Sequence, residues 1–293
     1  HIPPTYSIIT NIDREHMDFY SSMDDLKKYF IQFVQKVPSF GKSFICTDDK
    51  VTNSFVKNLK NKNFYTYGTN SRSNFLIKNI VQEKNFTEFD LFINLPNLKK
   101  QKIKKIKIPL IGIHNVRNSV AAIAVSMTIG ISIKDIKEGL LKFKGVQRRF
   151  NKIFTYNNVS YFDDYAHHPT EIKFVLEGVS KVYKDYDKVC VFQPHRVSRL
   201  RDLRKEFSFA FKNSNIVVLC PIYTAGEKIK LGFNYLNFSK EIVKNSNVKL
   251  FLVNNKIELA KFLKKNMYGK KIVIGMGAGT ISSWMRELPN LMK

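Results

Sequence analysis

The sequence predicts an α/β protein with two domains, and two observations carry that prediction. The chain has 293 residues, which is long for a single domain. From Asn151 onward, short apolar runs alternate with helical patterns, as in a mostly parallel, doubly wound sheet. The first half mixes strand-like and helical segments less regularly. We therefore expect one domain over residues 1–149 and a Rossmann-like domain over residues 150–293.

The first half is expected to begin with a strand that ends at Asp13. An amphipathic helix follows at 22–37, because its apolar residues recur at helical spacing. Further strands are expected at 43–46, 63–67 and 90–94, and the alternating second half of 99–107 is typical of a half-exposed strand. Apolar helices should occupy 119–130 and 133–143.

The second half is more regular. Strands are expected at 159–162, 188–192, 216–220, 248–253 and 271–274, and helices near 169–183, 197–213, 235–244, 256–267 and 282–288. Ligands of open α/β sheets bind outside the carboxyl ends of the strands. Polar residues that directly follow these strands are therefore the first candidates for a site.

Composition narrows the class of protein. No apolar run approaches the ~20 residues that span a bilayer, and three widely spaced cysteines suggest buried thiols in a reducing cytoplasm. The net charge of +25 comes mostly from scattered lysines. That pattern is typical of a solvated surface, which would attract anionic nucleotides but does not by itself indicate nucleic-acid binding. The first residue, His1, is not Met, so we expect a truncation there.

Two neighbouring strands of the second half end in polar clusters. The first reads Tyr161-Phe-Asp-Asp-Tyr-Ala-His-His-Pro-Thr-Glu171. Asp163 or Asp164 suits the hydroxyl groups of a ribose, His167 could reach a reacting centre, and His168 is expected to be structural. The second reads Phe192-Gln-Pro-His-Arg-Val-Ser-Arg199. Its two arginines suit carboxylate or phosphate oxygens better than lysine does.

Three polar segments of the first half are also candidates. Ile113-His-Asn-Val-Arg-Asn118 offers amides that suit an adenine edge, or alternatively a helix N-cap by Asn115 or Asn118. Gln147-Arg-Arg-Phe150 is either surface or a phosphate contact through Arg149. In Thr10-Asn-Ile-Asp-Arg-Glu-His-Met-Asp18, His16 is either a capping or surface histidine or a metal ligand.

Taken together, these motifs resemble the Mur ligase family, and especially its alanine-adding branch. The matching patterns are Gly-x-His-Asn-x-x-Asn-x-x-Ala-Ala, at 112–122, and Phe-Gln-Pro-His-Arg-x-x-Arg, at 192–199. The resemblance implies a partial central P-loop-type ATPase domain followed by a Rossmann-like C-terminal domain. It also implies a cytoplasmic enzyme that uses ATP and Mg²⁺ to ligate L-alanine to UDP-N-acetylmuramate through an acyl phosphate, with no nucleic-acid or membrane partner.

The resemblance also assigns roles to individual residues. It places ATP near His114, Asn115, Asn118, Arg149, Asp163 and Asp164, and Mg²⁺ near His16. The substrates would meet Tyr165, His167, His195, Arg196 and Arg199. Of all these residues, those expected to act in catalysis are His167, Arg149, Arg196 and Arg199.

The chain departs from the family pattern in one important respect. A Gly-x-x-Gly-Lys-Thr-type phosphate loop is missing, because Gly41-Lys-Ser43 has Lys36 where the upstream glycine belongs and follows a helix. The family's UDP-binding domain and an acidic Mg²⁺ ligand are missing as well. We therefore expect these 293 residues alone to be inactive. The alternatives are a murein-peptide recycling ligase and a non-catalytic, basic nucleotide- or nucleic-acid-binding protein.

Overall fold

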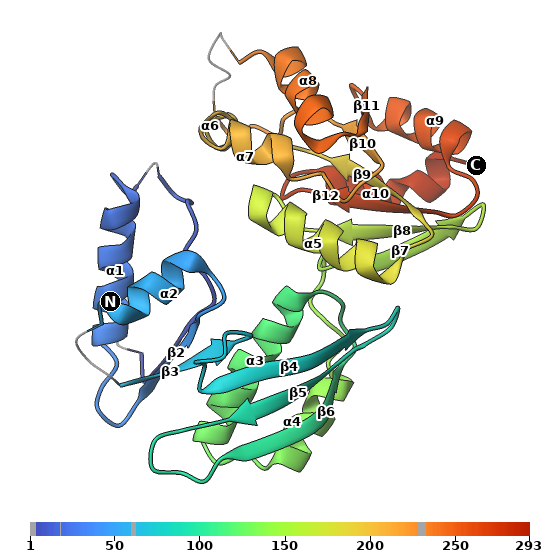
Figure 1. The fold of residues 1–293 in the computed structure, drawn as a ribbon. Coiled ribbons are helices and arrows are strands. Elements are labelled where there is room, and N and C mark those ends of the chain that lie inside the picture. The colour runs from blue at the N-terminus through green and yellow to red at the C-terminus, as the bar shows by residue number, and fades with distance from the viewer. Residues whose placement is uncertain (1–3, 18, 60–62, 228–232) are drawn as a thin grey trace. The chain divides into compact units, whose positions relative to one another are not determined.

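The computed structural model describes residues 4–17, 19–59, 63–227 and 233–293. These residues form two compact units, His1–Lys144 and Gly145–Lys293 (Figure 1). The turn at 145–150 belongs to the second unit, where the carbonyl of Arg148 accepts a hydrogen bond from the backbone N–H of Tyr165. Each unit contains a six-stranded sheet among the described residues, with helices packed on it. The predicted α/β class is confirmed.

The sheet of the first unit runs in sequence order, and its strands are β1 (Tyr6–Ile9), β2 (Lys42–Cys46), β3 (Phe64–Gly68), β4 (Phe75–Gln82), β5 (Thr87–Ile93) and β6 (Gln101–Ile108). The first four are parallel, and the last two pair antiparallel. Strand β4 was not predicted. Its alternating pattern is interrupted at Asn79, which has a φ of 53° and lies within a register shift.

Helices cover both faces of this sheet. They are α1 (Met23–Gln35), α2 (Lys50–Lys57), α3 (Ile113–Thr128) and α4 (Ile133–Lys142). Successive side chains of β2 alternate between the faces, so Phe44 and Cys46 pack with α3 while Ile45 packs with α1 and α2. The short helix α2 was missed because its residues are mostly polar.

Helix α3 begins at Ile113 rather than at the predicted Ser119. Its N-cap is Gly112, whose φ of 94° suits glycine, and no side chain caps this end of the helix. The alternative interpretation, an N-cap by Asn115 or Asn118, is therefore wrong. The early start matters, because it places His114, Asn115 and Asn118 on the first turns of the helix.

The Gly41-Lys42-Ser43 segment is confirmed as unrelated to a phosphate loop. It lies between α1 and β2, and the Ser43 hydroxyl accepts a hydrogen bond from the Ser7 hydroxyl at 2.8 Å inside the sheet. A Cβ atom on Gly41 would lie 1.9 Å from the Thr5 carbonyl oxygen, so the glycine permits close backbone packing.

In the second unit the strand order is β11-β10-β9-β12-β8-β7. These strands are β7 (Asn151–Tyr156), β8 (Val159–Asp164), β9 (Asp187–Phe192), β10 (Ile216–Leu219), β11 (Lys249–Leu252) and β12 (Lys271–Met276). All pairs are parallel except β7 with β8. The unpredicted β7 forms a hairpin through Asn157 and Asn158, whose φ values of 48° and 62° suit a primed turn.

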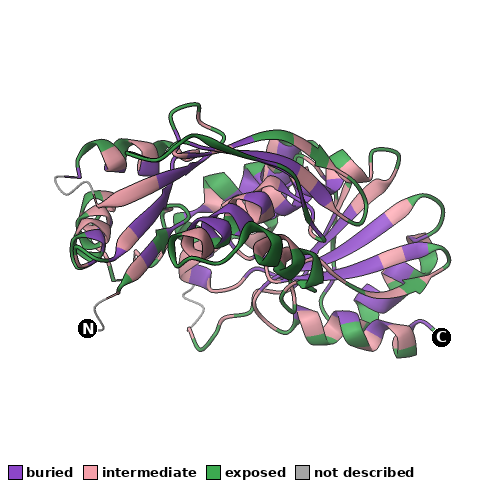
Figure 2. Cartoon of the chain, turned by 90° about the horizontal axis from the view of Figure 1, so that it is seen from below, coloured by how far each residue is buried: buried purple, intermediate pink, exposed green. Residues whose placement is uncertain are grey.

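Six helices complete the described part of this unit: α5 (Pro169–Val182), α6 (Val197–Asp202), α7 (Arg204–Phe209), α8 (Tyr235–Ser246), α9 (Lys256–Asn266) and α10 (Ile281–Leu291). Helices α9 and α10 pack on one face, through a core with Tyr161 and Val191. On the other face Phe192 packs against Phe207 and Phe211. The buried strands between exposed helix faces are visible in Figure 2. The predicted doubly wound sheet is confirmed, although the single helix expected at 197–213 is interrupted at Leu203.

The three cysteines are buried and unpaired, as expected. In the part of the chain that the structure describes, every helix is too short or too polar to cross a membrane.

Candidate active site

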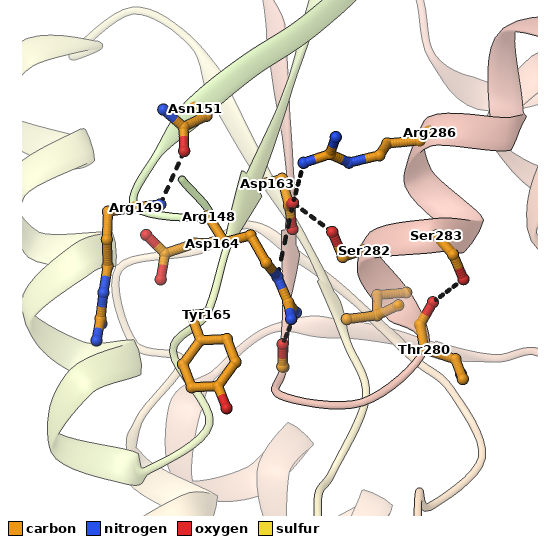
Figure 3. Close-up of polar contacts among 12 residues, drawn as sticks. Arg148, Arg149, Asn151, Asp163, Asp164, Tyr165, Thr280, Ser282, Ser283 and Arg286 are labelled. Atoms are coloured by element: carbon orange, nitrogen blue, oxygen red, sulfur yellow. Dashed lines mark hydrogen bonds and ion pairs between the residues drawn. The ribbon is translucent and has the colours of Figure 1, made fainter. Parts of the chain in front are cut away.

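Strand β8 ends in two buried aspartates. The Oδ2 atom of Asp163 accepts a hydrogen bond from the Ser282 hydroxyl at 2.5 Å. The same oxygen lies 3.8 Å from Nε of Arg148 and 3.7 Å from Nη2 of Arg286 (Figure 3). Asp163 was predicted as a ribose ligand. In this structure its carboxylate is 1% exposed and contacts side chains of its own unit.

Asp164 holds the backbone on both sides of it. Its Oδ1 atom accepts the N–H of Ala166 at 2.7 Å, and its Oδ2 atom accepts the N–H of Phe150 at 2.8 Å. Burial raises the pKa of Asp164 to about 6, although the two backbone hydrogen bonds oppose that shift. The carboxyl group therefore joins the end of β8 to the turn that precedes β7.

The two arginines of that turn differ in their surroundings. Arg148 donates from Nη2 to the Gly277 carbonyl at 2.6 Å, and its guanidinium carbon lies 4.7 Å from the centre of the Tyr165 ring. Arg149 is the predicted phosphate contact. Its side chain is 50% exposed, 3.8 Å from Glu171 and 5.7 Å from the same ring. Arg149 is thus the arginine that is available to a ligand.

The two histidines after β8 have separate tasks. His168 is the N-cap of α5, where its Nδ1 atom accepts the N–H of Thr170 and Glu171 accepts the N–H of His168. Its expected structural role is confirmed. The Nδ1 atom of His167 lies 2.9 Å from the Tyr165 carbonyl oxygen. Its ring lies 5.7 Å from the ring of His195, so the polar clusters after β8 and β9 meet as predicted.

His195 lies between Arg199 and Tyr223. Its Nδ1 atom is 3.1 Å from Nη1 of Arg199, and its ring stacks on that of Tyr223 at 5.5 Å. Burial, and after it the positive charge of the nearby Arg199, lowers the pKa of His195 to about 4. The ring is therefore neutral at pH 7 and can accept a hydrogen bond.

Arg196 and Arg199 are fixed at the start of α6. Arg196 has a φ of 67°, and its N–H donates to the Tyr223 carbonyl at 2.8 Å. Glu227 accepts hydrogen bonds from the N–H groups of Val197 and Ser198 and from the Ser198 hydroxyl. Burial would raise the pKa of Glu227, but these hydrogen bonds and Arg196 outweigh it and lower the pKa. The arginines are thus held by a loop that follows β10.

The glycines after β12 serve close packing. A Cβ atom on Gly277 would lie 2.6 Å from the Gln193 carbonyl oxygen, and one on Gly279 would lie 2.6 Å from Oε1 of Gln193. Gln193 in turn accepts the N–H of Ile281 and donates to Thr280. The loop brings the start of α10 against the end of β9. This close packing explains why glycines stand here, although they do not have the full spacing of a dinucleotide-binding motif.

In the first unit, the segment predicted to bind adenine, 113–118, is held by contacts with the preceding backbone and with Asp48, which follows β2. Asn115 donates to the Ile111 carbonyl at 2.7 Å, while Asn118 is exposed. Arg117 donates from Nε to Oδ2 of the buried Asp48 at 2.7 Å. The other oxygen of Asp48 accepts the N–H groups of Thr69 and Asn70. Asp48 therefore ties α3 to the ends of β2 and β3.

A pocket of about 220 Å³ opens at the same edge of the first sheet. Its lining is polar and comes from the end of β2, the start of α2 and the loop after β3: Thr47, Asp48, Asp49, Lys50, Asn53, Thr69 and Asn70. Asp49 caps α2 by accepting the N–H of Thr52. The pocket contains none of the predicted site residues.

His16 is exposed and has a φ of 58°. Across 4–17, 19–59, 63–227 and 233–293, no three His, Cys, Asp or Glu side chains gather in a way that could hold a metal ion. Asp18, which is part of the same motif, lies outside the described residues.

Sequence reasoning gave no individual role to three residues that shape the site in the second unit: Tyr223, Glu227 and Gln193. Tyr223 and Glu227 belong to the loop after β10, at a strand end of the parallel sheet, and the segment 221–227 resembles the Mur family only as a whole. Gln193 lies inside a quoted motif, but its role depends on the glycine loop after β12, which is far away in sequence.

Comparison with known proteins agrees with this architecture. The family model of the Mur ligase middle domain matches residues 1–126, and that of the Mur ligase, glutamate ligase domain matches residues 148–279. The chain belongs to the Mur ligase family.

Individual relatives carry the name of one member of that family. The chain is 66% identical to the UDP-N-acetylmuramate–L-alanine ligase of Pelagibacter ubique over 292 residues, which is 100% of this chain and 63% of that relative. It is 40% identical over 293 residues to the same ligase of Rickettsia africae, covering 98% of this chain and 60% of the relative. The chain thus spans about three-fifths of the length of these relatives.

A solved structure shows the same fold. The crystal structure of the UDP-N-acetylmuramate–alanine ligase of Thermotoga maritima has a TM-score of 0.74 and 23% sequence identity, and the match covers 99% of this chain and 60% of that one.

Proposed function

We propose that this chain is the nucleotide- and amino-acid-handling part of an ATP-dependent ligase that joins L-alanine to UDP-N-acetylmuramate, in the synthesis of peptidoglycan precursors in the cytoplasm. The high identity to a ligase of that name supports the assignment. The observation that carries it is the cluster of His167, His195 and Arg199 at the carboxyl edge of a parallel sheet, beside Arg196.

The proposed reaction has two chemical steps. A carboxylate oxygen of the muramoyl group attacks the γ-phosphorus of ATP, and the bond from that phosphorus to ADP breaks. The amine of L-alanine then attacks the acyl carbon and loses a proton, and the bond from carbon to the phosphate-bearing oxygen breaks. The products are an amide, ADP and phosphate. Binding and orientation of the reactants would supply most of the acceleration.

The basic groups of the second unit suit the negative charge of these reactants. Arg196 and Arg199 are assigned to the carboxylates of alanine and the muramoyl group, because a planar guanidinium binds a carboxylate through two hydrogen bonds. The neutral His195 accepts from Arg199 and so fixes the direction of its guanidinium. His167 and Tyr165 are assigned to the same substrates, close to the acyl carbon.

Each unit contains residues that are candidates for binding a nucleotide. His114, Asn115 and Asn118 on the first turns of α3 would meet the adenine, whereas Asp163 and Asp164, whose buried carboxylates already bind groups of their own unit, are not assigned to the ribose. Arg149 would contact the transferring phosphoryl group, since its side chain is exposed at the strand edge. We expect Mg²⁺ to accompany ATP, because that ion is usually bound through substrate phosphates, water and few protein ligands. His16 remains the candidate among the residues of this chain.

An assay of the amino donor tests this function. The protein would be a full-length version, in which the chain is joined to the part of the Pelagibacter ubique relative that it does not cover. With ATP and UDP-N-acetylmuramate, L-alanine should be incorporated in preference to other amino acids and to the tripeptide of recycled murein. Selective use of the tripeptide would identify a recycling ligase instead. Salt-dependent binding to duplex DNA without ligation would favour a nucleic-acid-binding protein.

A further inference from the structure

The turn at 145–150 is held in an unusual backbone conformation. Two of its non-glycine residues, Arg148 and Phe150, have φ values of 59° and 52°. Such left-handed residues cost on the order of 1 kcal/mol each or more, and they persist where the surrounding structure holds them. The contacts of this turn show what holds it and which side chain it presents.

Arg148 anchors the first side of the turn. Its Nη2 atom donates to the Gly277 carbonyl, its Nε atom lies 3.8 Å from Oδ2 of Asp163, and its guanidinium carbon lies 4.7 Å from the centre of the Tyr165 ring. Its own carbonyl accepts the N–H of Tyr165 at 2.7 Å. The residue therefore connects the turn to the ends of β8 and β12.

Phe150 anchors the other side. Its N–H donates to Oδ2 of Asp164 at 2.8 Å, and its ring stacks on Phe162 with centres 4.2 Å apart. The two adjacent aspartates of β8 thus hold the two residues that flank Arg149. Asp163 contacts the side chain of Arg148, and Asp164 contacts the backbone of Phe150.

Arg149 has no comparable anchor on its side chain. Its backbone N–H donates to Asn151 Oδ1 at 3.0 Å, but its guanidinium lies 3.8 Å from the half-exposed Glu171. In Figure 3 the side chain of Arg148 passes beside Asp163 and is joined to it by a dashed line, whereas that of Arg149 extends on the other side of the view, away from Asp163. With the left-handed backbone at Arg148 and Phe150 fixed, the direction in which Arg149 leaves the turn is fixed as well.

We propose that Arg148 and Asp163 are a positioning pair, which presents Arg149 to the transferring phosphoryl group. The proposal rests on the proposed function, in which Arg149 contacts that group. Arg148 is assigned the positioning role because its guanidinium contacts Gly277, Asp163 and Tyr165 and its side chain is 23% exposed, less than half the exposure of Arg149. A lysine at position 148 would keep the charge but lose the fork that reaches Gly277 and Asp163 together.

A double-mutant cycle in the full-length version tests the pair. Arg149→Ala should lower kcat by ~10²-fold, the usual cost of removing one group that stabilises charge in the transition state. Arg148→Ala should lower kcat by about tenfold to a hundredfold through misplacement of Arg149, with little change in KM for L-alanine. Once Arg149 is absent, the second substitution should cost less than about twofold, because residues that act as a unit are not additive.

Two further variants separate positioning from simple destabilisation. Asp163→Asn keeps the shape and the contact with Ser282 but removes the charge beside Arg148, and it should lower kcat as Arg148→Lys does. Arg286→Ala is the matched control, because Arg286 lies 3.7 Å from the same Asp163 oxygen without touching the turn. It should leave kcat within about twofold of the parent. Circular dichroism and thermal unfolding would establish that each variant is folded.

The possible outcomes separate the positioning role of Arg148 from the phosphate-binding role of Arg149. If Arg149→Ala is impaired but the loss from Arg148→Ala adds fully to it, Arg148 does not act through Arg149 and the positioning role is wrong. The same conclusion follows if Arg286→Ala lowers kcat as much as Asp163→Asn does. If Arg149→Ala retains full activity, the phosphate role of Arg149 fails and the positioning role fails with it.

Discussion

The Nη1 atom of Arg199 lies 3.1 Å from Nδ1 of His195, so a cation and an imidazole share one hydrogen bond. That geometry requires a neutral ring, because a protonated Nδ1 would be a donor facing a donor. Burial and the surrounding positive charge lower the pKa of His195 to about 4, which agrees with the contact. The ring can therefore orient the guanidinium throughout the neutral pH range.

The first prediction is that His195 stays neutral well below pH 6. In the 293-residue chain, its ¹⁵N and ¹H ring resonances should titrate near pH 4, not near 6.5. The folded pKa is depressed, so this histidine's contribution to stability is present above pH ~6.5 and is lost as pH falls toward 4. Urea unfolding at pH 7 and pH 5 measures this effect. The free energy of unfolding should fall less between the two pH values in His195→Asn than in the parent. A ring that titrates above pH 6 would refute the assignment.

The second prediction concerns the two arginines of the Gln-Pro-His-Arg motif. In the full-length version, Arg196→Lys and Arg199→Lys should each lower kcat/KM for L-alanine by about tenfold or more, because lysine lacks the planar fork. Thermal stability should change little. Arg201→Lys is the control, since the Arg201 side chain is 63% exposed on the same helix and pairs with Asp202. Kinetics equal to the parent in both test variants would remove the carboxylate-binding role.

Most of the second unit could be predicted from sequence, because its strands are buried on both faces and read as apolar runs between helices. The order of its strands could not be read, and the hairpin strand β7 was missed, since its half-exposed pattern depends on pairing with β8. In the first unit, β4 was hidden by the bulge at Asn79, and α2 by its polar composition.

The motifs of the candidate site could be predicted from the sequence. Which residue of each motif is structural and which is exposed to a ligand could not. The sequence offered no reason to treat the adjacent Arg148 and Arg149 differently. In the structure the side chain of Arg148 is 23% exposed and lies against Asp163, whereas that of Arg149 is 50% exposed. His167 and His168 differ in the same way, because the N-terminus of α5 uses only the second as its cap. Such assignments depend on partners that are distant in sequence, such as Gly277.

The third prediction is that Asp164 titrates near pH 6. Its folded pKa is raised above the usual value of 3.8, so its contribution to stability is fully present below pH ~4 and is lost as pH rises through 6. The lost contribution to the free energy of unfolding is roughly 3 kcal/mol. The side-chain ¹³C resonance of Asp164 should show this midpoint, and Asp164→Asn should remove the corresponding slope of stability against pH. A midpoint below pH 4 would contradict it.

The fourth prediction tests the role of Asp48 in the first unit. Gly68 has a φ of 144°, and a Cβ atom there would lie 2.4 Å from Oδ1 of Asp48. That oxygen is held by the N–H groups of Thr69 and Asn70 and cannot move away freely. Gly68→Ala should therefore destabilise the chain by about 3 kcal/mol, among the larger effects of single substitutions.

The control for that substitution is Gly130→Ala. Gly130 also has a positive φ, of 86°, but nothing lies within 4 Å of the added Cβ atom. It should cost only about 1 kcal/mol of backbone strain. Urea unfolding of the 293-residue chain measures both. Equal losses would mean that the contact with Asp48 is easily relieved.

The fifth prediction concerns the first turns of α3. Asn118 is exposed and does not cap its helix, so its amide is available to a nucleotide. Asn118→Ala in the full-length version should weaken binding of a non-hydrolysable ATP analogue by about tenfold, the loss of ~1.4 kcal/mol of hydrogen bonding. Affinity for UDP-N-acetylmuramate should not change. Calorimetric titrations with each ligand measure both, and unchanged affinity for the analogue would exclude an adenine contact.

The central claim is that this chain forms part of a ligase that activates the muramoyl carboxylate with ATP and transfers the acyl group to L-alanine. In the most direct test, the full-length version is given ATP, L-alanine and UDP-N-acetylmuramate in which both carboxylate oxygens are ¹⁸O. Mass spectrometry should find one ¹⁸O atom in the released phosphate for each molecule of UDP-N-acetylmuramoyl-L-alanine formed. Absence of the alanyl product, or phosphate without the label, would contradict the account.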